Sequence, residues 1–161
     1  MQISKQKATI IFVDFSKAFD SVNRKVMFQI LDNYGIPSQI IKAISIMYNH
    51  STSFVQSMDG PTKEFKTTSG ILQGDTFAPY LFVIAVDYIL LQSVENMKEK
   101  GLDVKPDRTS RDKGKYLADL DYADDIALIA KHIRNAQDLL SSVENASAKL
   151  VCFLTQRKLS T

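Results

Sequence analysis

The sequence has very little of the chemistry that cysteine and histidine supply. Cys152 is the only cysteine among 161 residues, and the chain has two histidines and no tryptophan. One thiol cannot form an internal disulfide, which is typical of a protein from a reducing compartment. One thiol and two histidines also argue against a structural zinc site. We therefore expect an intracellular protein.

Long apolar runs and a strong excess of one charge are also missing. The first apolar run, residues 8–13, is interrupted at Asp14, too soon for a signal peptide or a membrane span. The net charge is only +2 and the pI about 8.6, whereas a protein that grips a nucleic-acid duplex usually has a larger basic excess. We expect no membrane partner, and composition alone neither requires nor excludes nucleic acid.

What is present is sufficient for a folded core. Apolar residues make up 45% and charged residues 24%, close to the average of soluble globular proteins. The length corresponds to about one domain, and no shift in composition divides the chain. We expect residues 1–161 to form a single domain.

Hydrophobic patterning predicts short strands mixed with helices. The β-branched and aromatic segment 8–15 predicts a buried strand that ends at an acid. Residues 116–122 and 126–130 predict a tight hairpin with acids at its tip. The other expected strands are a hairpin, 52–57 with 62–66, and a last segment, 150–154.

Apolar residues at helical spacing predict four helices. They are expected over 21–33, from Ser38 onward, over 76–97 and over 133–146. Ser38 is expected to cap its helix, with Ile40, Ile41, Ile44 and Met47 on the inner face. The polar stretch 103–114 predicts a surface loop. Strands and helices do not alternate regularly, which favours an α+β fold with a small antiparallel sheet backed by helices.

Two of these strands carry acids at their ends. The first ends in Phe-Val-Asp14-Phe, and the hairpin tip contains Tyr-Ala-Asp124-Asp125. Carboxylates about 4 Å apart repel by roughly 4 kcal/mol at an effective dielectric near 20. Such a cluster must bind a proton or a cation, and Mg²⁺ suits an oxygen-rich site shared with phosphates.

Two such ions can run an in-line phosphoryl displacement. One would activate a 3′-hydroxyl, and the other would hold a triphosphate and stabilise the leaving pyrophosphate. However, an Asp at a strand end is most often a turn or cap residue, and an Asp-Asp pair at a hairpin tip is more often structural than catalytic. Spacing alone does not bring Asp14 to Asp124.

Three segments, in this order, carry a resemblance to a known family. FVDFSKAFDSV (12–22), GILQGDTFAPYLF (70–82) and YADD (122–125) resemble the central palm motifs A, B and C of reverse transcriptases. The resemblance covers about residues 10–158 and is closest to retroelements without long terminal repeats and to group II introns. It implies a polymerase palm whose antiparallel sheet carries the acids. It also implies RNA-directed DNA polymerase activity, with nucleotidyl transfer from dNTPs onto a primer 3′-hydroxyl.

The resemblance assigns roles to single residues. Asp14 and Asp124 match the shared metal ligands, Asp125 matches their lesser neighbour, and the carbonyl of Phe15 is expected to contact a metal. Phe19 matches the aromatic steric gate that excludes a ribose 2′-hydroxyl, although core packing is an alternative role. The implied cofactors are two Mg²⁺ ions, for which Mn²⁺ could substitute.

The second motif and the tail complete the expected site. Gln73 is expected to contact the nucleotide or the template, and Gly74 lets the backbone approach both. Pro79 should lie in the first turn of the following helix, and Asp20 is expected to be structural, as a helix cap. Lys158 matches a lysine that neutralises or protonates the leaving pyrophosphate.

The tail also departs from the family pattern. Val151 stands where the family has Gly, and Thr155 stands where it has Asn. These departures weaken the role of Lys158 and suggest a decaying copy. A non-catalytic, nucleic-acid-binding remnant is therefore an alternative. An unrelated metal-dependent phosphohydrolase is a third interpretation, but it gives no purpose to Gln73, Gly74 or Phe19.

The resemblance also implies partners and a context. An RNA template, a DNA primer and dNTPs are the expected partners. The fingers and thumb of the family would lie mostly outside this sequence, so we expect a fragment that is inactive by itself. A nuclear location is implied by the resemblance. The sequence leaves open which retroelement it came from, whether an endonuclease is attached, how synthesis is primed and which oligomer forms.

Overall fold

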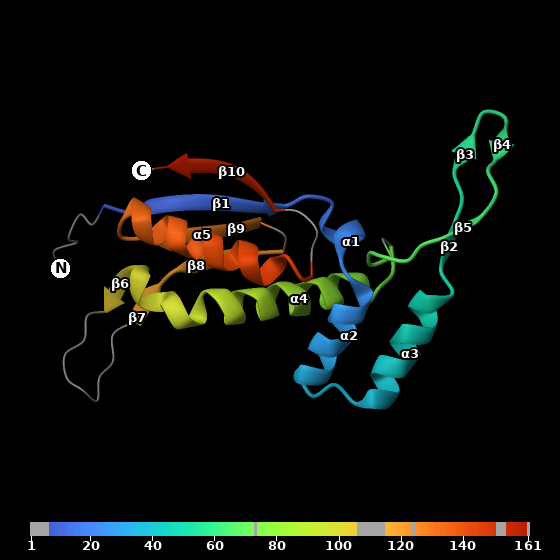
Figure 1. The fold of residues 1–161 in the computed structure, drawn as a ribbon, viewed down its shortest axis with the longest axis horizontal. Coiled ribbons are helices and arrows are strands. Elements are labelled where there is room, and N and C mark those ends of the chain that lie inside the picture. Colours follow the sequence, from blue (N-terminus) through green and yellow to red (C-terminus); the bar gives the residue numbers. More distant parts are fainter. Residues whose placement is uncertain (1–6, 73, 106–114, 124, 151–153, 161) are drawn as a thin grey trace.

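The computed structural model describes residues 7–72, 74–105, 115–123, 125–150 and 154–160, with Lys105 and Leu154–Ser160 described by their backbone. A four-stranded sheet lies against two long helices, and two shorter helices extend from one end of this body (Figure 1). No helix in the described ranges is both long and apolar enough to cross a membrane.

The elements occur in an irregular order along the chain. The helices are α1 (Ala18–Ser21), α2 (Arg24–Asn33), α3 (Ser38–Asn49), α4 (Ala78–Ser93), the 3₁₀ helix η1 (Glu95–Lys100) and α5 (Ile133–Ser147). The strands are β1 (Thr9–Phe15), β2 (Thr52–Ser53), β3 (Gln56–Ser57), β4 (Gly60–Pro61), β5 (Phe65–Lys66), β6 (Leu102–Lys105), β7 (Lys115–Leu117), β8 (Asp119–Tyr122), β9 (Asp125–Ala130) and β10 (Leu154–Ser160).

The main sheet has the order β10-β1-β9-β8, and every neighbouring pair is antiparallel. The first strand therefore lies in the middle, between two strands from the last quarter of the chain. The predicted α+β class with a small antiparallel sheet backed by helices is confirmed.

The sheet has one covered face and one open face. In β1, Ile11, Val13 and Phe15 are buried, whereas Phe12 is 46% exposed. Because side chains alternate along a strand, the buried residues face α4 and α5 and the others face away. Asp14 thus belongs to the open face, together with Phe12. The long helix α4 completes the core with eight buried residues.

The predicted helix over 21–33 is interrupted. Val22 is extended, and Asn23 caps α2 by accepting hydrogen bonds from the backbone nitrogens of Lys25 and Val26. Val22 is completely buried, and its carbonyl accepts a hydrogen bond from Gly70, which a continuous helix would forbid. The cap of α2 is therefore Asn23, and the prediction that Asp20 caps the next helix is wrong.

The inner face predicted for α3 is only half right. Ile44 is buried and Ile41 partly so, but Ile40 and Met47 are about half exposed, and Tyr48 is fully buried in their place. Among the described helices, this helix packs mainly against α2, so a narrower stripe is covered than the pattern suggests. Ser38 is the first helical residue, after Pro37, and makes no side-chain cap.

Several boundaries also differ from the prediction. The long helix ends at Ser93, and residues 95–100 continue as η1. Part of the expected loop 103–114 is strand β6, paired with β7, and residues 106–114 lie outside the described ranges. The last strand begins at Leu154 rather than Leu150, and residues 151–153 again lie outside the description.

The hairpin predicted over 52–66 is confirmed, and it projects away from the body beyond α3 (Figure 1). Two short ladders, β2–β5 and β3–β4, hold it together. Phe54, Val55, Met58 and Phe65 in this hairpin are each at least half exposed.

Candidate active site

Strand pairing brings two of the predicted acids together. In the register of β1 and β9, Asp14 lies directly opposite Asp125. Opposed residues of an antiparallel pair have Cα atoms about 4.5–5.5 Å apart and point their side chains to the same face. The two carboxylates therefore share the open face of the sheet, although 110 residues separate them in the sequence. Asp124 lies outside the described residues.

The geometry of the hairpin tip explains why Asp125 reaches this position. Tyr122 and Asp125 are the last opposed pair of β8 and β9. Ala123, between them, has the left-handed backbone angle φ 57°, which suits a two-residue turn. The second acid is thus held at the first residue of a strand whose next residue, Ile126, is buried.

The donor set at this position suits a hard cation. Two facing carboxylates offer the oxygen ligands that Mg²⁺ prefers. Among the described residues, no group of three or more His, Cys, Asp or Glu side chains could hold a metal ion. The predicted three-acid set includes Asp124 and stays a prediction.

Two predicted site residues pack on one ring of α4. Phe15 is buried and meets Phe82 edge-on, with ring centroids 6.1 Å apart. Phe19 stacks on the same ring at 4.9 Å and an interplanar angle of 27°, and it is only partly buried. Phe82 therefore packs against both Phe15 and Phe19, the two aromatic residues that follow Asp14 in the first motif. Phe82 ends the second quoted motif, but no sequence pattern predicted this packing role for it.

The loop that carries the second motif is pinned to the segment after Asp14. The Gly70 nitrogen donates to the Val22 carbonyl at 2.8 Å, and the Ile71 nitrogen donates to the Phe19 carbonyl at 2.7 Å. Gly74 has φ +88° and is exposed, with open space where a Cβ would stand. Gln73 lies outside the described residues. Pro79 is in the first turn of α4, as predicted.

Comparison with known proteins decides the family. The chain matches the family described as "Reverse transcriptase (RNA-dependent DNA polymerase)" over residues 1–161. The chain belongs to this family.

Several curated relatives are Pol polyproteins of retrotransposable elements. The chain is 26% identical over 135 residues to a Pol polyprotein from the type-1 retrotransposable element R2 of Nasonia vitripennis, covering 84% of this chain and 12% of that protein. It is 25% identical over 157 residues to the R2 counterpart of Bradysia coprophila, covering 98% and 17%. A 78-residue match to the R2DM polyprotein of Drosophila melanogaster is 30% identical and covers 48% and 7%. The chain thus spans less than a fifth of these relatives.

A buried arginine in this reverse transcriptase chain had no place in the sequence analysis. Arg24, in the first turn of α2, is 7% exposed. Its Nε donates to the Gly70 carbonyl at 2.7 Å, and its Nη1 donates to the carbonyls of Tyr48 and Thr67 and to Ser51 Oγ at 2.7–3.0 Å. Burial lowers the pKa of this guanidinium, which nevertheless stays charged. An arginine in an amphipathic pattern gives no signal that it will be buried.

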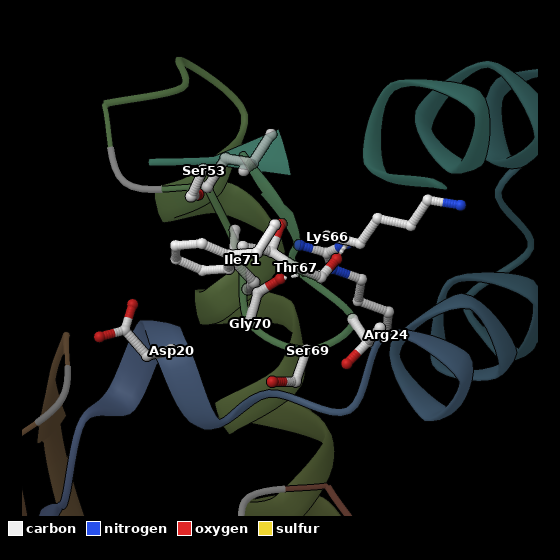
Figure 2. A pocket seen from close by; sticks show the side chains of 11 residues that line it. Asp20, Arg24, Ser53, Lys66, Thr67, Ser69, Gly70 and Ile71 are labelled. Carbon is white, nitrogen blue, oxygen red and sulfur yellow. Dashed lines mark hydrogen bonds between the residues drawn. The ribbon is translucent and has the colours of Figure 1, made fainter. Parts of the chain in front are cut away.

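A polar cavity lies beside this arginine. It has a volume of about 590 Å³, and Arg24, Asp20 and the segment Lys66–Leu72 line it together with Ser53 and Phe65. Figure 2 shows Arg24 reaching from its helix toward Thr67 and Gly70, with Asp20 on the opposite side. The cavity therefore adjoins the second-motif loop rather than the carboxylates of β1 and β9.

The backbone of the last strand runs along β1. Thr155 is opposite Asp14, and Lys158 is opposite Phe12, with a register shift between Phe12 and Val13. The strand that contains Lys158 therefore neighbours the strand of the first acid. The role expected of Lys158 stays a prediction.

Two further acids lie on the helix-facing side of β8. Asp119 and Asp121 line a cavity of about 200 Å³ with Asp87, Glu95 and Lys98. Burial, and then repulsion by Asp121, raises the pKa of Asp119, and Lys98 opposes this shift. Asp119 is half-buried, whereas Asp121 is exposed.

Proposed function

We propose that this chain carries the catalytic core of an RNA-directed DNA polymerase, which joins deoxynucleotides to the 3′-hydroxyl of a DNA primer on an RNA template. The pairing of β1 with β9 carries the proposal, because it opposes Asp14 and Asp125 in a chain of the reverse transcriptase family. A polymerase needs acids from separate parts of its sequence at one point, and this pairing provides them.

The carboxylates would act by holding cations. Asp14, Asp125 and the neighbouring Asp124 would bind two Mg²⁺ ions, or Mn²⁺ in their place, with help from the Phe15 carbonyl. When bound, these ions would lower the pKa of the primer hydroxyl and stabilise the charge of the leaving pyrophosphate. The sheet would keep the carboxylates in position, since Ile126 and Phe15, which follow the acids, are buried in the core.

The remaining residues would orient the substrates. Phe19, held against Phe82, would present its ring edge to the sugar of the incoming nucleotide and exclude a 2′-hydroxyl. Gly74, which has no side chain, would let the backbone approach the base pair closely, with Gln73 beside it. Lys158 would neutralise the pyrophosphate.

The test is the change Asp14→Asn in an active polymerase that carries this segment. The amide keeps the shape but loses the charge that binds metal. We expect primer extension to fall by about three orders of magnitude, a typical size for losing a group that stabilises the transition state. Template binding should stay within about twofold, because the acid makes no favourable contact with phosphate.

The matched control is Asp138→Asn, which removes a carboxylate from an exposed site on α5 next to Lys100. Primer extension should be unchanged in this variant. If Asp14→Asn retains synthesis within a few-fold of the parent, the carboxylate has no catalytic role. A parent that binds template but makes no product would favour the non-catalytic remnant, to which the departures at Val151 and Thr155 also point.

A further inference from the structure

The second-motif loop is tied to the body of the protein at both of its ends. At the first end, Arg24 Nε donates to the Gly70 carbonyl at 2.7 Å. At the second end, Tyr48 Oη donates to Asp75 Oδ2 at 3.2 Å, and Asp75 Oδ1 accepts from the Phe77 nitrogen at 3.2 Å. The loop between these ends contains Gly74.

The two side chains that make these ties also bind each other. The Arg24 guanidinium carbon lies 5.2 Å from the centre of the Tyr48 ring, and Arg24 Nη1 donates to the Tyr48 carbonyl at 2.7 Å. Both residues are buried, Tyr48 completely. The loop is therefore attached at both ends to one buried pair, formed between α2 and α3.

Each member of the pair is suited to its contact. A planar guanidinium donates several hydrogen bonds in fixed directions, so Arg24 can hold Gly70, Thr67 and Tyr48 at once. Burial and then Asp75 raise the pKa of Tyr48 to about 12, so its hydroxyl stays protonated and donates to Asp75 at neutral pH. Neither Arg24 nor Tyr48 belongs to the pair of acids, Asp14 and Asp125, on β1 and β9.

We propose that Arg24 and Tyr48 are positioning residues, which fix Gly70 and Asp75, at the two ends of the loop that contains Gly74, in the place where this loop meets the nucleotide and the template. This inference rests on the proposed function for the identity of what the loop meets. The attachment itself does not depend on it.

Hydrogen exchange of backbone amides in the 161-residue chain tests the attachment. The change Tyr48→Phe keeps the ring against Arg24 and removes only the hydroxyl. We expect amides of residues 75–78 to exchange about tenfold faster, because one partly buried hydrogen bond to the Asp75 carboxylate is lost. Exchange in the sheet should be unchanged.

A matched control is Tyr34→Phe, since Tyr34 also donates its hydroxyl to an aspartate, Asp87, but away from the loop. It should leave exchange at residues 70–78 as in the parent. Arg24→Lys keeps the charge without the planar fork, and it should speed exchange at residues 67–72. Loop exchange equal to the parent in Tyr48→Phe, or faster exchange spread over the whole chain, would overturn the proposal.

Single-nucleotide primer extension in an active polymerase carrying this segment tests the consequence. Tyr48→Phe should raise KM for the dNTP by about tenfold and leave kcat within about twofold, because the chemistry at the acids is intact. Tyr34→Phe should change neither value. A KM equal to the parent's would overturn the link between loop and nucleotide. An inactive parent would instead contradict the proposed function, while the exchange experiment would still decide the attachment.

Discussion

Phe19 is in contact with the core and lies five residues beyond an acid of the proposed site. Its ring stacks on Phe82, yet the side chain is only partly buried. These two facts correspond to two roles, packing and exclusion of a ribose. Measurements of stability and of nucleotide selectivity distinguish these roles. If Phe19 only packs the core, its truncation should lower the activity with ribonucleotides and deoxynucleotides together.

Phe19→Ala should therefore be measured with both nucleotide types. We expect the protein to lose roughly 2–4 kcal/mol of unfolding free energy, somewhat less than for a fully buried ring. In an active polymerase carrying this segment, kcat/KM for ribonucleotides relative to deoxynucleotides should rise by at least about tenfold, because the clash with the 2′-hydroxyl is gone. If the ratio is unchanged while both activities fall, Phe19 is a packing residue only.

Asp119 should make the protein less stable at neutral pH. Its pKa is raised in the folded protein, so the folded state binds its proton more tightly than the unfolded state does. Its contribution to stability is then fully present below the unfolded pKa and is lost as pH rises through the folded pKa. Asp119→Asn should raise the unfolding free energy slightly at pH 7, because solvent screens a half-buried charge, and this gain should vanish near pH 3.

A second aspartate gives the opposite sign as a control. The hydrogen bond from Lys100 lowers the pKa of Asp138, so its contribution is present above the unfolded pKa and is lost as pH falls through the folded pKa. Asp138→Asn should lower stability slightly at pH 7. Denaturant unfolding between pH 3 and pH 7 measures both variants, and a destabilised Asp119→Asn would contradict the repulsion by Asp121.

Among single residues, the sequence motifs indicated the pair of acids better than they indicated the side chains around it. Asp14 and Asp125 were identified from short motifs, and strand pairing opposes them. The support around them was not predictable, because Arg24 and Tyr48 are buried through contacts with segments 24 to 46 residues away. A local sequence pattern does not predict which distant carbonyl group will accept a hydrogen bond from a given side chain.

Among the elements, the loop before α4 depends on two glycines for different reasons. Both have a left-handed backbone, with φ +80° at Gly70 and φ +88° at Gly74. A Cβ at Gly70 would lie 2.8 Å from the Asp20 Cα and carbonyl oxygen, whereas a Cβ at Gly74 would meet nothing within 4 Å. The close approach at Gly70 is what allows the loop to bond to Val22.

Alanine at these two positions should have unequal effects. Gly74→Ala should lower the unfolding free energy by about 1–2 kcal/mol, the cost of a left-handed residue with a Cβ. Gly70→Ala should lower it by at least about 1 kcal/mol more, because the backbone of α1 must also move. Chemical denaturation of the two variants measures this difference. Equal losses would show that the contact with Asp20 does not constrain the loop.

Elements with a strong period were predicted well, whereas the break between two helices was not. The helix α5 and the strand β1 agree with the sequence pattern to within a residue or two. The break at Val22 was missed because a buried valine fits a helical stripe as well as an extended segment. What decides between them is the hydrogen bond from Gly70, made by a distant part of the chain.

For the whole molecule, the projecting hairpin and the body should be separable in stability. Replacing residues 54–64 with a short Gly-Ser turn keeps Ser51 and Thr67, which contact Arg24. We expect the unfolding free energy to change by less than about 1 kcal/mol, because the removed apolar side chains are mostly exposed.

Phe82→Ala provides the comparison, and its loss of roughly 3–5 kcal/mol is typical of a buried ring. Thermal or denaturant unfolding measures both variants. A hairpin replacement as costly as Phe82→Ala would show that the hairpin is a part of the core.

The central position of β1 has a consequence for synthesis on the ribosome. Its residues, Thr9–Phe15, are synthesised well before the strands with which they pair, which begin at Asp125 and Leu154. At about 5–20 residues per second, β1 waits roughly 5–20 s for its first neighbour. During that time an apolar, β-branched segment is exposed, which is the type of sequence that aggregates or recruits chaperones. The strand that carries the first acid thus stays exposed in the nascent chain until β9, which carries the second acid, has been synthesised.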